Sequence, residues 1–338
     1  MEYNQKPIQR PPKRVSKEGL IDMKIVVAYG GTSPEREVSL NSGKAVCEAL
    51  SERGHSAVLE DVHSPRAFVE KWHSFGADGV FIALHGDWGE DGRFQTCLDA
   101  YGIPYTGSGP EACMFAMDKT VAKLLFSING IPLADGTVIH KGEYPGPRER
   151  DMLSKYGALI VKPNSGGSTV GVTKAETFEE LRAGIDSCWS AYGSEDKALV
   201  EEYIPGREIT VPVWEKEAGE VIALPAIDIR PKVGFYDYRN KYTSGCTEYI
   251  CPAQFPAELS QKIGELAVLA HKSLGCRSYS RVDLRVTEEG KPYVLEVNTA
   301  PGMTATSLVP KSARAYGLGF GEFLESVIRV SFGVKRRF

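Results

Sequence analysis

Short apolar strands alternate with helical segments over the first third of this chain. Residues 23–29 (MKIVVAY) form a continuous apolar run that ends at two glycines, a pattern typical of a buried parallel strand. The next elements are predicted to be a helix, a strand, a helix and a strand, over residues 39–53, 56–62, 64–75 and 78–84. This order requires a parallel sheet with right-handed crossovers, and such sheets bind ligands beyond the carboxyl ends of their strands. Two of these ends carry the polar segments 30–39 and 85–92.

The pattern changes near Gly107, and two further units follow. The second is predicted to hold a helix, a strand, a Gly-rich loop, a helix and a strand, over residues 112–129, 158–162, 164–171, 177–189 and 198–203. The third is predicted to hold an antiparallel pair of strands over residues 207–214 and 221–229. A polar aromatic loop, a helix, a hairpin and a last helix are predicted to follow, over residues 234–245, 256–274, 280–298 and 319–332. A chain of 338 residues exceeds the usual size of one domain. We therefore expect a mobile N-terminal extension and three domains, over residues 1–22, 23–107, 108–205 and 206–338.

The charge balance excludes some classes of partner. The 40 Lys and Arg residues against 44 Asp and Glu residues leave a formal net charge of −4, which gives no electrostatic reason to expect a nucleic acid or a membrane. No stretch approaches the roughly 18 apolar residues of a membrane helix. Residues 1–22 are polar and lack the apolar core of a secretory signal. Seven cysteines without a CxxC spacing fit packing roles in a reducing compartment, so we expect a cytoplasmic protein.

The most informative segment is SRVDLRVTEEGKPYVLEVN, residues 280–298. It is predicted to form two alternating strands around a two-residue turn at Glu289-Gly290. Pairing centred on that turn opposes residues 283 and 296, and brings four polar side chains to one face of the sheet: Arg281, Asp283, Glu296 and Asn298. Two carboxylates and an amide supply the hard oxygen ligands that Mg²⁺ shares with phosphate, and paired carboxylates are hard to keep charged without a cation. The alternative is a solvated hairpin face with cross-strand charge pairs, which the Val, Leu and Tyr content of both strands disfavours.

Two other segments suggest a nucleotide. In KPNSGGSTVG (162–171) the glycines free backbone N–H groups to wrap an anion, and Lys162 adds positive charge. The segment is neither a Walker A loop nor a GxGxxG fingerprint, and alone it could be an ordinary turn. In EEYIPGRE (201–208) a strand edge could offer backbone groups to a purine, and Glu208 could accept from ribose hydroxyls. Without context this too is an ordinary loop.

These pieces, in this order, resemble the ATP-grasp superfamily, and the rest of the chain resembles the D-alanine–D-alanine ligase family. The segments that carry the resemblance are GGTSPEREVSLNSG (30–43), LHGDWGEDGRFQ (84–95), PYTGSGPEA (104–112), MDK (117–119), VKPNSGGSTVGV (161–172), EEYIPGREITV (201–211), FYDYRNKY (235–242), SRVDLRV (280–286) and EVNTAPGMTATSLVPKSA (296–313). The resemblance implies an α/β fold: an N-terminal parallel α/β domain, then a two-part ATP-grasp fold made of the central and C-terminal domains. It also implies ligation of two D-alanine molecules through an acyl phosphate, for peptidoglycan synthesis, and a homodimer.

The resemblance implies a role for each matching residue. ATP phosphates are contacted by Lys119 and Lys162, and the adenine and ribose by Glu201, Tyr203, Ile204 and Glu208. Two Mg²⁺ ions, with Mn²⁺ as the alternative, are bound by Asp283, Glu296 and Asn298. The first D-alanine is bound by Glu35 with His85 nearby, and the oxyanion by Arg281 and the N–H of Gly302. The second substrate is bound by Ser307 and Leu308. On the loop that closes the site, Tyr242 bonds to Ser168 and Glu35, and Lys241 approaches phosphate.

Three alternatives stay open. One is a ligase of the same fold with D-lactate or D-serine as second substrate; ester-forming relatives usually lack the lid tyrosine, so Tyr242 favours the dipeptide. A second is another ATP-grasp carboxylate–amine ligase, which the EREVS and SLVP segments disfavour. A third is a catalytically silent nucleotide-binding protein. One departure from the family pattern lies in the phosphate loop, which reads Asn164-Ser165-Gly166-Gly167 where many relatives carry a charged residue before the glycine.

Overall fold

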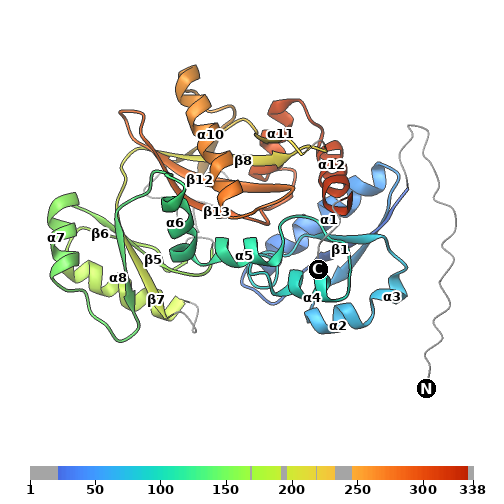
Figure 1. The fold of residues 1–338 in the computed structure, drawn as a ribbon, viewed down its shortest axis with the longest axis horizontal. Coiled ribbons are helices and arrows are strands. Elements are labelled where there is room, and N and C mark those ends of the chain that lie inside the picture. The colour runs from blue at the N-terminus through green and yellow to red at the C-terminus, as the bar shows by residue number, and fades with distance from the viewer. Residues whose placement is uncertain (1–21, 168–169, 192–195, 218, 233–245, 334–338) are drawn as a thin grey trace.

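The computed structural model describes residues 22–167, 170–191, 196–217, 219–232 and 246–333. Their strands form three sheets, one parallel and two antiparallel (Figure 1). The expected fold class is thereby confirmed. The expected extension at 1–22 falls almost wholly outside the described residues. None of the helices in the described ranges combines the length and the apolar composition that crossing a membrane requires.

The first sheet has the strand order β2-β1-β3 and is parallel, as predicted. Its strands and covering helices are β1 (Lys24–Tyr29), α1 (Arg36–Glu52), β2 (Ser56–Asp61), α2 (Pro65–Glu70), α3 (Trp72–Phe75), β3 (Gly79–Ile82) and α4 (Arg93–Ala100). The single helix predicted over 64–75 was wrong, because the chain divides at Lys71 into α2 and α3. Helix α4 was not predicted, although Phe94 and Leu98 form a buried stripe on it.

The second sheet has the order β4-β7-β5-β6 and is antiparallel. Its unit comprises α5 (Pro110–Met117), α6 (Lys119–Ile128), β4 (Gly136–His140), α7 (Pro147–Tyr156), β5 (Leu159–Pro163), β6 (Thr173–Ala175), α8 (Phe178–Ala191) and β7 (Lys197–Glu202). The helix predicted over 112–129 is broken at Asp118, whose backbone is extended (φ −82°, ψ 99°) and whose side chain caps α6 by accepting from Val121 N–H at 3.0 Å. Because of this break, Lys119 is the first residue of α6, and its side chain reaches the Gly166 carbonyl of the glycine-rich loop.

The third sheet has the order β11-β10-β8-β12-β13, with β9 also paired to β8. Its elements are β8 (Arg207–Glu215), β9 (Val221–Ala223), β10 (Ile227–Pro231), β11 (Thr247–Ile250), α10 (Ala257–Ser273), β12 (Tyr279–Val286), β13 (Pro292–Asn298), α11 (Leu308–Tyr316) and α12 (Phe320–Gly333). The return strand predicted over 221–229 is interrupted around Pro225 and becomes β9 and β10.

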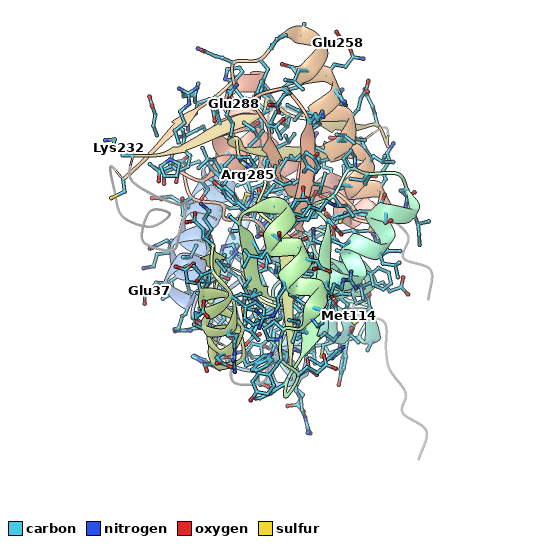
Figure 2. All side chains as sticks on the ribbon, turned by 90° about the vertical axis from the view of Figure 1, so that its left-hand side faces the viewer. Glu37, Met114, Lys232, Glu258, Arg285 and Glu288 are labelled. Atoms are coloured by element: carbon cyan, nitrogen blue, oxygen red, sulfur yellow. The ribbon has the colours of Figure 1, made fainter. Side chains whose placement is uncertain are left out.

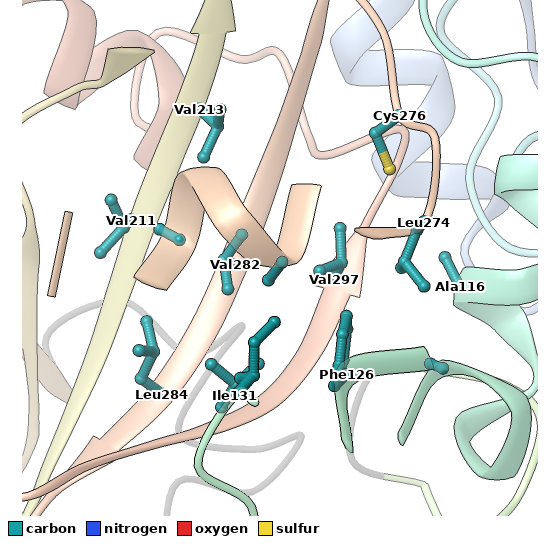
Figure 3. Close-up of a cluster of buried hydrophobic side chains, with 14 of the residues drawn as sticks. Ala116, Phe126, Ile131, Val211, Val213, Leu274, Cys276, Val282, Leu284 and Val297 are labelled. Carbon is teal, nitrogen blue, oxygen red and sulfur yellow. The ribbon is translucent and has the colours of Figure 1, made fainter. Parts of the chain in front are cut away.

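The two faces of the third sheet differ sharply. Figure 3 shows the apolar side, where Val211, Val282 and Val297 pack with Phe126 of α6 in the core that α10 covers. Alternate residues of β12 point the other way and are polar, as the period of two requires. The opposite face therefore carries the charged side chains of the site.

Helix α12 returns the end of the chain to its beginning and lies beside α1 (Figure 1). Phe323 and Val327 of this helix share one buried core with Ile25 of β1 and Val46 of α1. The N-terminal sheet is thus held against the third sheet, and the polar ends of β1 and β3 face the same region as β12 and β13.

Candidate active site

A large cleft lies between the two antiparallel sheets and encloses about 1120 Å³, including the open space at its mouth. Ten residues predicted for the site line it: Lys119, Lys162, Glu201, Tyr203, Ile204, Glu208, Arg281, Asp283, Glu296 and Leu308. Apolar side chains, among them Ile160, Val172 and Ile229, make up much of the remaining wall. A cleft with apolar walls and converging polar groups is typical of a site for a small molecule.

Glu201 lines this cleft and is only 2 % exposed. Its Oε2 is 2.6 Å from Lys162 Nζ, and its Oε1 pairs with Lys123 Nζ. Burial alone would raise the pKa of the Glu201 carboxyl, but the two ammonium groups outweigh burial and hold that pKa below its ordinary value. Lys123 was not predicted for the site, and its spacing of one turn from Lys119 is the signal that could have found it.

Glu208 is held by Arg285, another residue that was not predicted. Arg285 Nη1 lies 3.3 Å from Glu208 Oε2, and the same guanidinium donates to the Ile204 carbonyl at 3.0 Å and to the Tyr203 hydroxyl at 3.3 Å. Figure 2 shows Arg285 where side chains of the second and third sheets meet. Burial raises the pKa of Glu208 to about 7, with Arg285 opposing and Asp283 adding to the rise.

The hairpin of β12 and β13 pairs Asp283 with Glu296 and Arg281 with Asn298, as predicted. The predicted two-residue turn was wrong. Thr287 N–H bonds to the Lys291 carbonyl and Gly290 N–H to the Thr287 carbonyl, which makes a three-residue loop with Gly290 at φ +76°. The pairing next to this loop is shifted by one residue, and a bulge after Asp283 shifts it back. The bulge therefore restores the predicted pairs at the site.

Cations already neutralise the hairpin carboxylates. Arg281 donates two hydrogen bonds to the Asp283 carboxylate, at 2.9 and 2.7 Å, and the Thr210 hydroxyl donates a third. Lys119 Nζ lies 3.6 Å from Glu296 Oε2. In the described residues no group of three or more His, Cys, Asp and Glu side chains forms a metal cage. Two carboxylates and the Asn298 amide fit Mg²⁺ that completes its shell with phosphate oxygens.

The glycine-rich loop after β5 is anchored on the start of α6. Gly166 has φ +97°, a region that favours glycine. Its N–H points to Met117 Sδ at 3.2 Å, and its carbonyl accepts from Lys119 Nζ at 2.7 Å. Asn164 accepts at its carbonyl from Lys119 N–H and at Oδ1 from Thr120 N–H, so the loop satisfies two orphan N–H groups of the helix.

A smaller polar hollow adjoins the cleft and encloses about 460 Å³, including open solvent. Glu35, Glu90 and Asn298 line it, and it shares five wall residues with the cleft: Lys119, Gly166, Gly167, Arg281 and Glu296. Glu35 precedes α1 without making a side-chain cap bond. Glu90 was not predicted individually, although it lies in the 85–92 segment, and burial raises its pKa. The hollow can receive a small molecule with a positive group at its acidic end.

Three predicted residues lie beside the two hollows rather than on their walls. His85 is buried, and its ring bonds to Ser42 Oγ at 3.0 Å and to the Ala300 carbonyl at 2.9 Å. Ser307 Oγ accepts from Thr304 N–H at 3.0 Å, and a Cβ on Gly302 would approach Ser307 Oγ to 3.1 Å. His85 thus ties the end of β3 to the loop before α11. Ser168, Lys241 and Tyr242 lie outside the described residues.

Comparison with known proteins identifies the family. The D-ala D-ala ligase N-terminus model matches residues 66–108, and the D-ala D-ala ligase C-terminus model matches residues 125–329. The chain is 44 % identical to a D-alanine–D-alanine ligase of Halalkalibacterium halodurans, over 91 % of this chain and 99 % of that protein. It is 43 % identical to one of Geobacter sulfurreducens, over 93 % and 96 % of the two chains.

Solved structures agree with the sequence matches. The D-alanine–D-alanine ligase of Bacillus anthracis complexed with ATP has a TM-score of 0.79 and 34 % identity, covering 92 % of this chain and 97 % of that one. The VanG D-Ala:D-Ser ligase of Enterococcus faecalis has a TM-score of 0.75 and 29 % identity, covering 92 % and 99 %. The family models and the curated relatives both span most of the site. This chain belongs to the D-alanine–D-alanine ligase family.

Proposed function

We propose that this chain joins two D-alanine molecules into D-alanyl-D-alanine and splits ATP to ADP and phosphate, for peptidoglycan precursor synthesis. The observation that carries the proposal is the wall shared by the two hollows. A nucleotide in the cleft and an amino acid in the hollow would meet at Lys119, Arg281 and Glu296. That is where a carboxylate and a terminal phosphate must approach each other despite their like charges.

The nucleotide is oriented by groups at the two ends of the cleft. Adenine lies at Glu201, Tyr203 and Ile204, where the wall is apolar and one carboxylate can accept from its amino group. The ribose lies at Glu208. Lys119 and Lys162 neutralise phosphate oxygens, and the glycine-rich loop offers its N–H groups to them. Two Mg²⁺ ions, or Mn²⁺ in their place, would be held by Asp283, Glu296 and Asn298 and would offset phosphate charge.

The first D-alanine lies in the small hollow with its ammonium at Glu35. Its carboxylate oxygen attacks the γ-phosphorus, and ADP leaves from the opposite side, which gives D-alanyl phosphate. The amine of the second D-alanine, placed by Ser307 and Leu308, attacks the acyl carbon after losing a proton. Arg281 and the Gly302 N–H stabilise the resulting oxyanion, which collapses with loss of phosphate. We propose that the loop with Lys241 and Tyr242 closes the site and keeps water from the acyl phosphate, with Tyr242 bonding to Ser168 and Glu35 and Lys241 approaching phosphate.

The organisation of the chain follows from the same proposal. We propose domains over 23–107, 108–205 and 206–338, each of which contains one of the three sheets. ATP as a substrate supports a cytoplasmic location, and we expect a homodimer without nucleic-acid or membrane partners.

The test is ADP release by the purified protein with Mg²⁺ and ATP. D-alanine alone is compared with D-alanine plus D-lactate and with D-alanine plus D-serine, and products are identified by mass. ADP release with D-alanine alone and D-alanyl-D-alanine as product is the expected result. Turnover only with a mixed pair would show that the second substrate is D-lactate or D-serine rather than D-alanine. No turnover with any pair would contradict ligase activity.

The raised pKa of Glu208 predicts how ATP binding depends on pH. The carboxyl is about half protonated near pH 7, and only its ionised form is a pure acceptor for ribose hydroxyls. Ionisation proceeds as the pH rises through about 7, so the apparent affinity for ATP should increase between pH 6 and pH 8, by up to about tenfold. The KM for ATP measured at half-unit pH steps checks this. Glu208→Gln should flatten the profile, and an equally steep profile in that variant would assign the dependence to another group.

A further inference from the structure

Helix α6 directs two lysines at the site, one turn apart. Lys119 Nζ reaches the Gly166 carbonyl and Glu296, while Lys123 Nζ pairs with Glu201. Residues four apart on a helix lie on the same face, which explains why both side chains point inward. The lysine of the first turn touches the phosphate-binding loop. The lysine of the second turn instead pairs with the Glu201 carboxylate, which also lines the cleft.

The Glu201 carboxylate sits between two ammonium groups. Lys162 approaches one oxygen at 2.6 Å and lines the cleft, whereas Lys123 holds the other oxygen and is not among the residues that line it. Both lysine side chains are 11 % exposed and that of Glu201 is 3 % exposed. Burial lowers the pKa of the Lys123 ammonium, and the attraction of Glu201 opposes this. The three charged groups therefore lie together where little solvent reaches them, and this burial costs desolvation free energy.

One lysine is enough to neutralise the single charge of Glu201, so the presence of a second lysine calls for an explanation. Lys162 faces the cleft and is proposed to contact a phosphate of the nucleotide. When it does so, its hold on Glu201 weakens. Lys123 does not line the cleft and remains in place, so Glu201 stays ionised and fixed while the nucleotide is bound.

We propose that Lys123 is a positioning residue for nucleobase selection: it holds Glu201 as a fixed, ionised acceptor that favours a purine with an amino group over one with a carbonyl oxygen at the same ring position. The inference rests on the proposed function, since it assumes that the base of ATP lies at Glu201. An amino group donates to a carboxylate, but a carbonyl oxygen is repelled by it. A protonated Glu201 could donate to the carbonyl oxygen, so the selection depends on the charge that Lys123 maintains.

The variants are Lys123→Met, which removes the charge at similar size, and Lys123→Arg, which keeps it. Lys272→Met, on the exposed face of α10, is the matched control. Equilibrium binding of ATP and of inosine triphosphate, each with Mg²⁺, is measured for every protein, together with kcat and KM for ATP. Lys123→Met should reduce the preference for ATP over inosine triphosphate by about tenfold or more, since hydrogen bonds to charged groups are worth that much. The change should fall on the KM for ATP rather than on kcat.

A purely structural role predicts something different. Replacing a buried ion-pair member by an apolar residue would then lower the melting temperature and leave the ratio of the two affinities unchanged. Lys123→Arg should keep the preference within about threefold of the unchanged protein, as should the control. An unchanged preference in Lys123→Met, or an equal loss in Lys123→Arg, would overturn the inference. If Lys123→Met does not fold, Lys123→Gln is judged by the same ratio.

The binding measurement separates this inference from the proposed ligase activity. If the unchanged protein binds ATP but forms no dipeptide, the ligase proposal fails and the affinity ratio still decides the role of Lys123. If the dipeptide forms and the ratio does not respond to Lys123→Met, only the inference fails.

Discussion

Arg281→Met is expected to lower kcat by about 10³-fold, while binding of ATP changes by only a few fold. Arg281 lines both hollows, so its guanidinium is available to a developing oxyanion and not only to a ground-state group. It also makes two bonds to Asp283 that a methionine cannot replace. Loss of one such donor in other enzymes costs about 10²–10³ in kcat, and the loosened Asp283 adds to this. The measurement is ADP release at saturating ATP and D-alanine.

Two comparison variants give that result its meaning. Arg281→Lys keeps the charge but not the two-pronged geometry, so it should still lose about 10²-fold. Arg314→Met alters an exposed arginine near the end of α11 and should leave kcat unchanged. A loss in Arg281→Met that appears only as weaker ATP binding would assign Arg281 to the nucleotide and not to the reaction.

The strands of the site could be predicted because their signals are local. Alternation in 280–298 gave both strands, and the pairs 283–296 and 281–298 were right even though the turn was not. The error in the turn and the missed bulge cancel at the site. A bulge depends on how β12 and β13 pack against their neighbours, and no local pattern in the sequence encodes that.

Elements whose stability comes from distant contacts could not be predicted in this way. Helix α7 lies in a polar stretch, and β4 is a strand of only five residues that pairs with β7 over its whole length. Asp118 breaks a helix whose composition is continuously favourable, because Asn164 of the glycine-rich loop takes the N–H groups that the break exposes. Contacts between distant segments, rather than local composition, therefore determine where the strand forms and where the helix breaks.

The missed residues of the site share a physical cause. Lys123 and Arg285 pair with Glu201 and Glu208, and these pairs form only when helix α6 and the two antiparallel sheets pack together. Sequence motifs identify the residues that contact a ligand, but they do not identify the residues that hold those side chains in position. His85, Ser307 and Gly302 lie outside the walls of both hollows, so their roles stay predictions. The bonds that the structure gives His85 and Ser307 are to Ser42, the Ala300 carbonyl and Thr304 N–H.

Glu296→Gln is expected to raise the Mg²⁺ concentration needed for half-maximal ADP release by about 10- to 100-fold and to lower kcat by about 10²-fold. Glu296 lines both hollows, and its side chain is 34 % exposed, so it is open to an ion at the junction. The amide keeps the size of the side chain and removes the charge that pairs with Lys119 and that, in the proposed function, would bind a divalent cation.

The same change separates a metal site from a solvated hairpin face. If Glu296 and Asp283 were only cross-strand partners, Glu296→Gln would alter stability slightly and leave the Mg²⁺ dependence unchanged. Glu288→Gln, in the exposed loop of the same hairpin, is the matched control and should not alter that dependence. A Mg²⁺ titration at fixed ATP distinguishes the two cases, since a lost ligand is partly rescued by excess metal and a lost contact to substrate is not. Rescue in Glu296→Gln and none in Arg281→Met would separate the metal-binding role of the hairpin from the role of its arginine in the reaction.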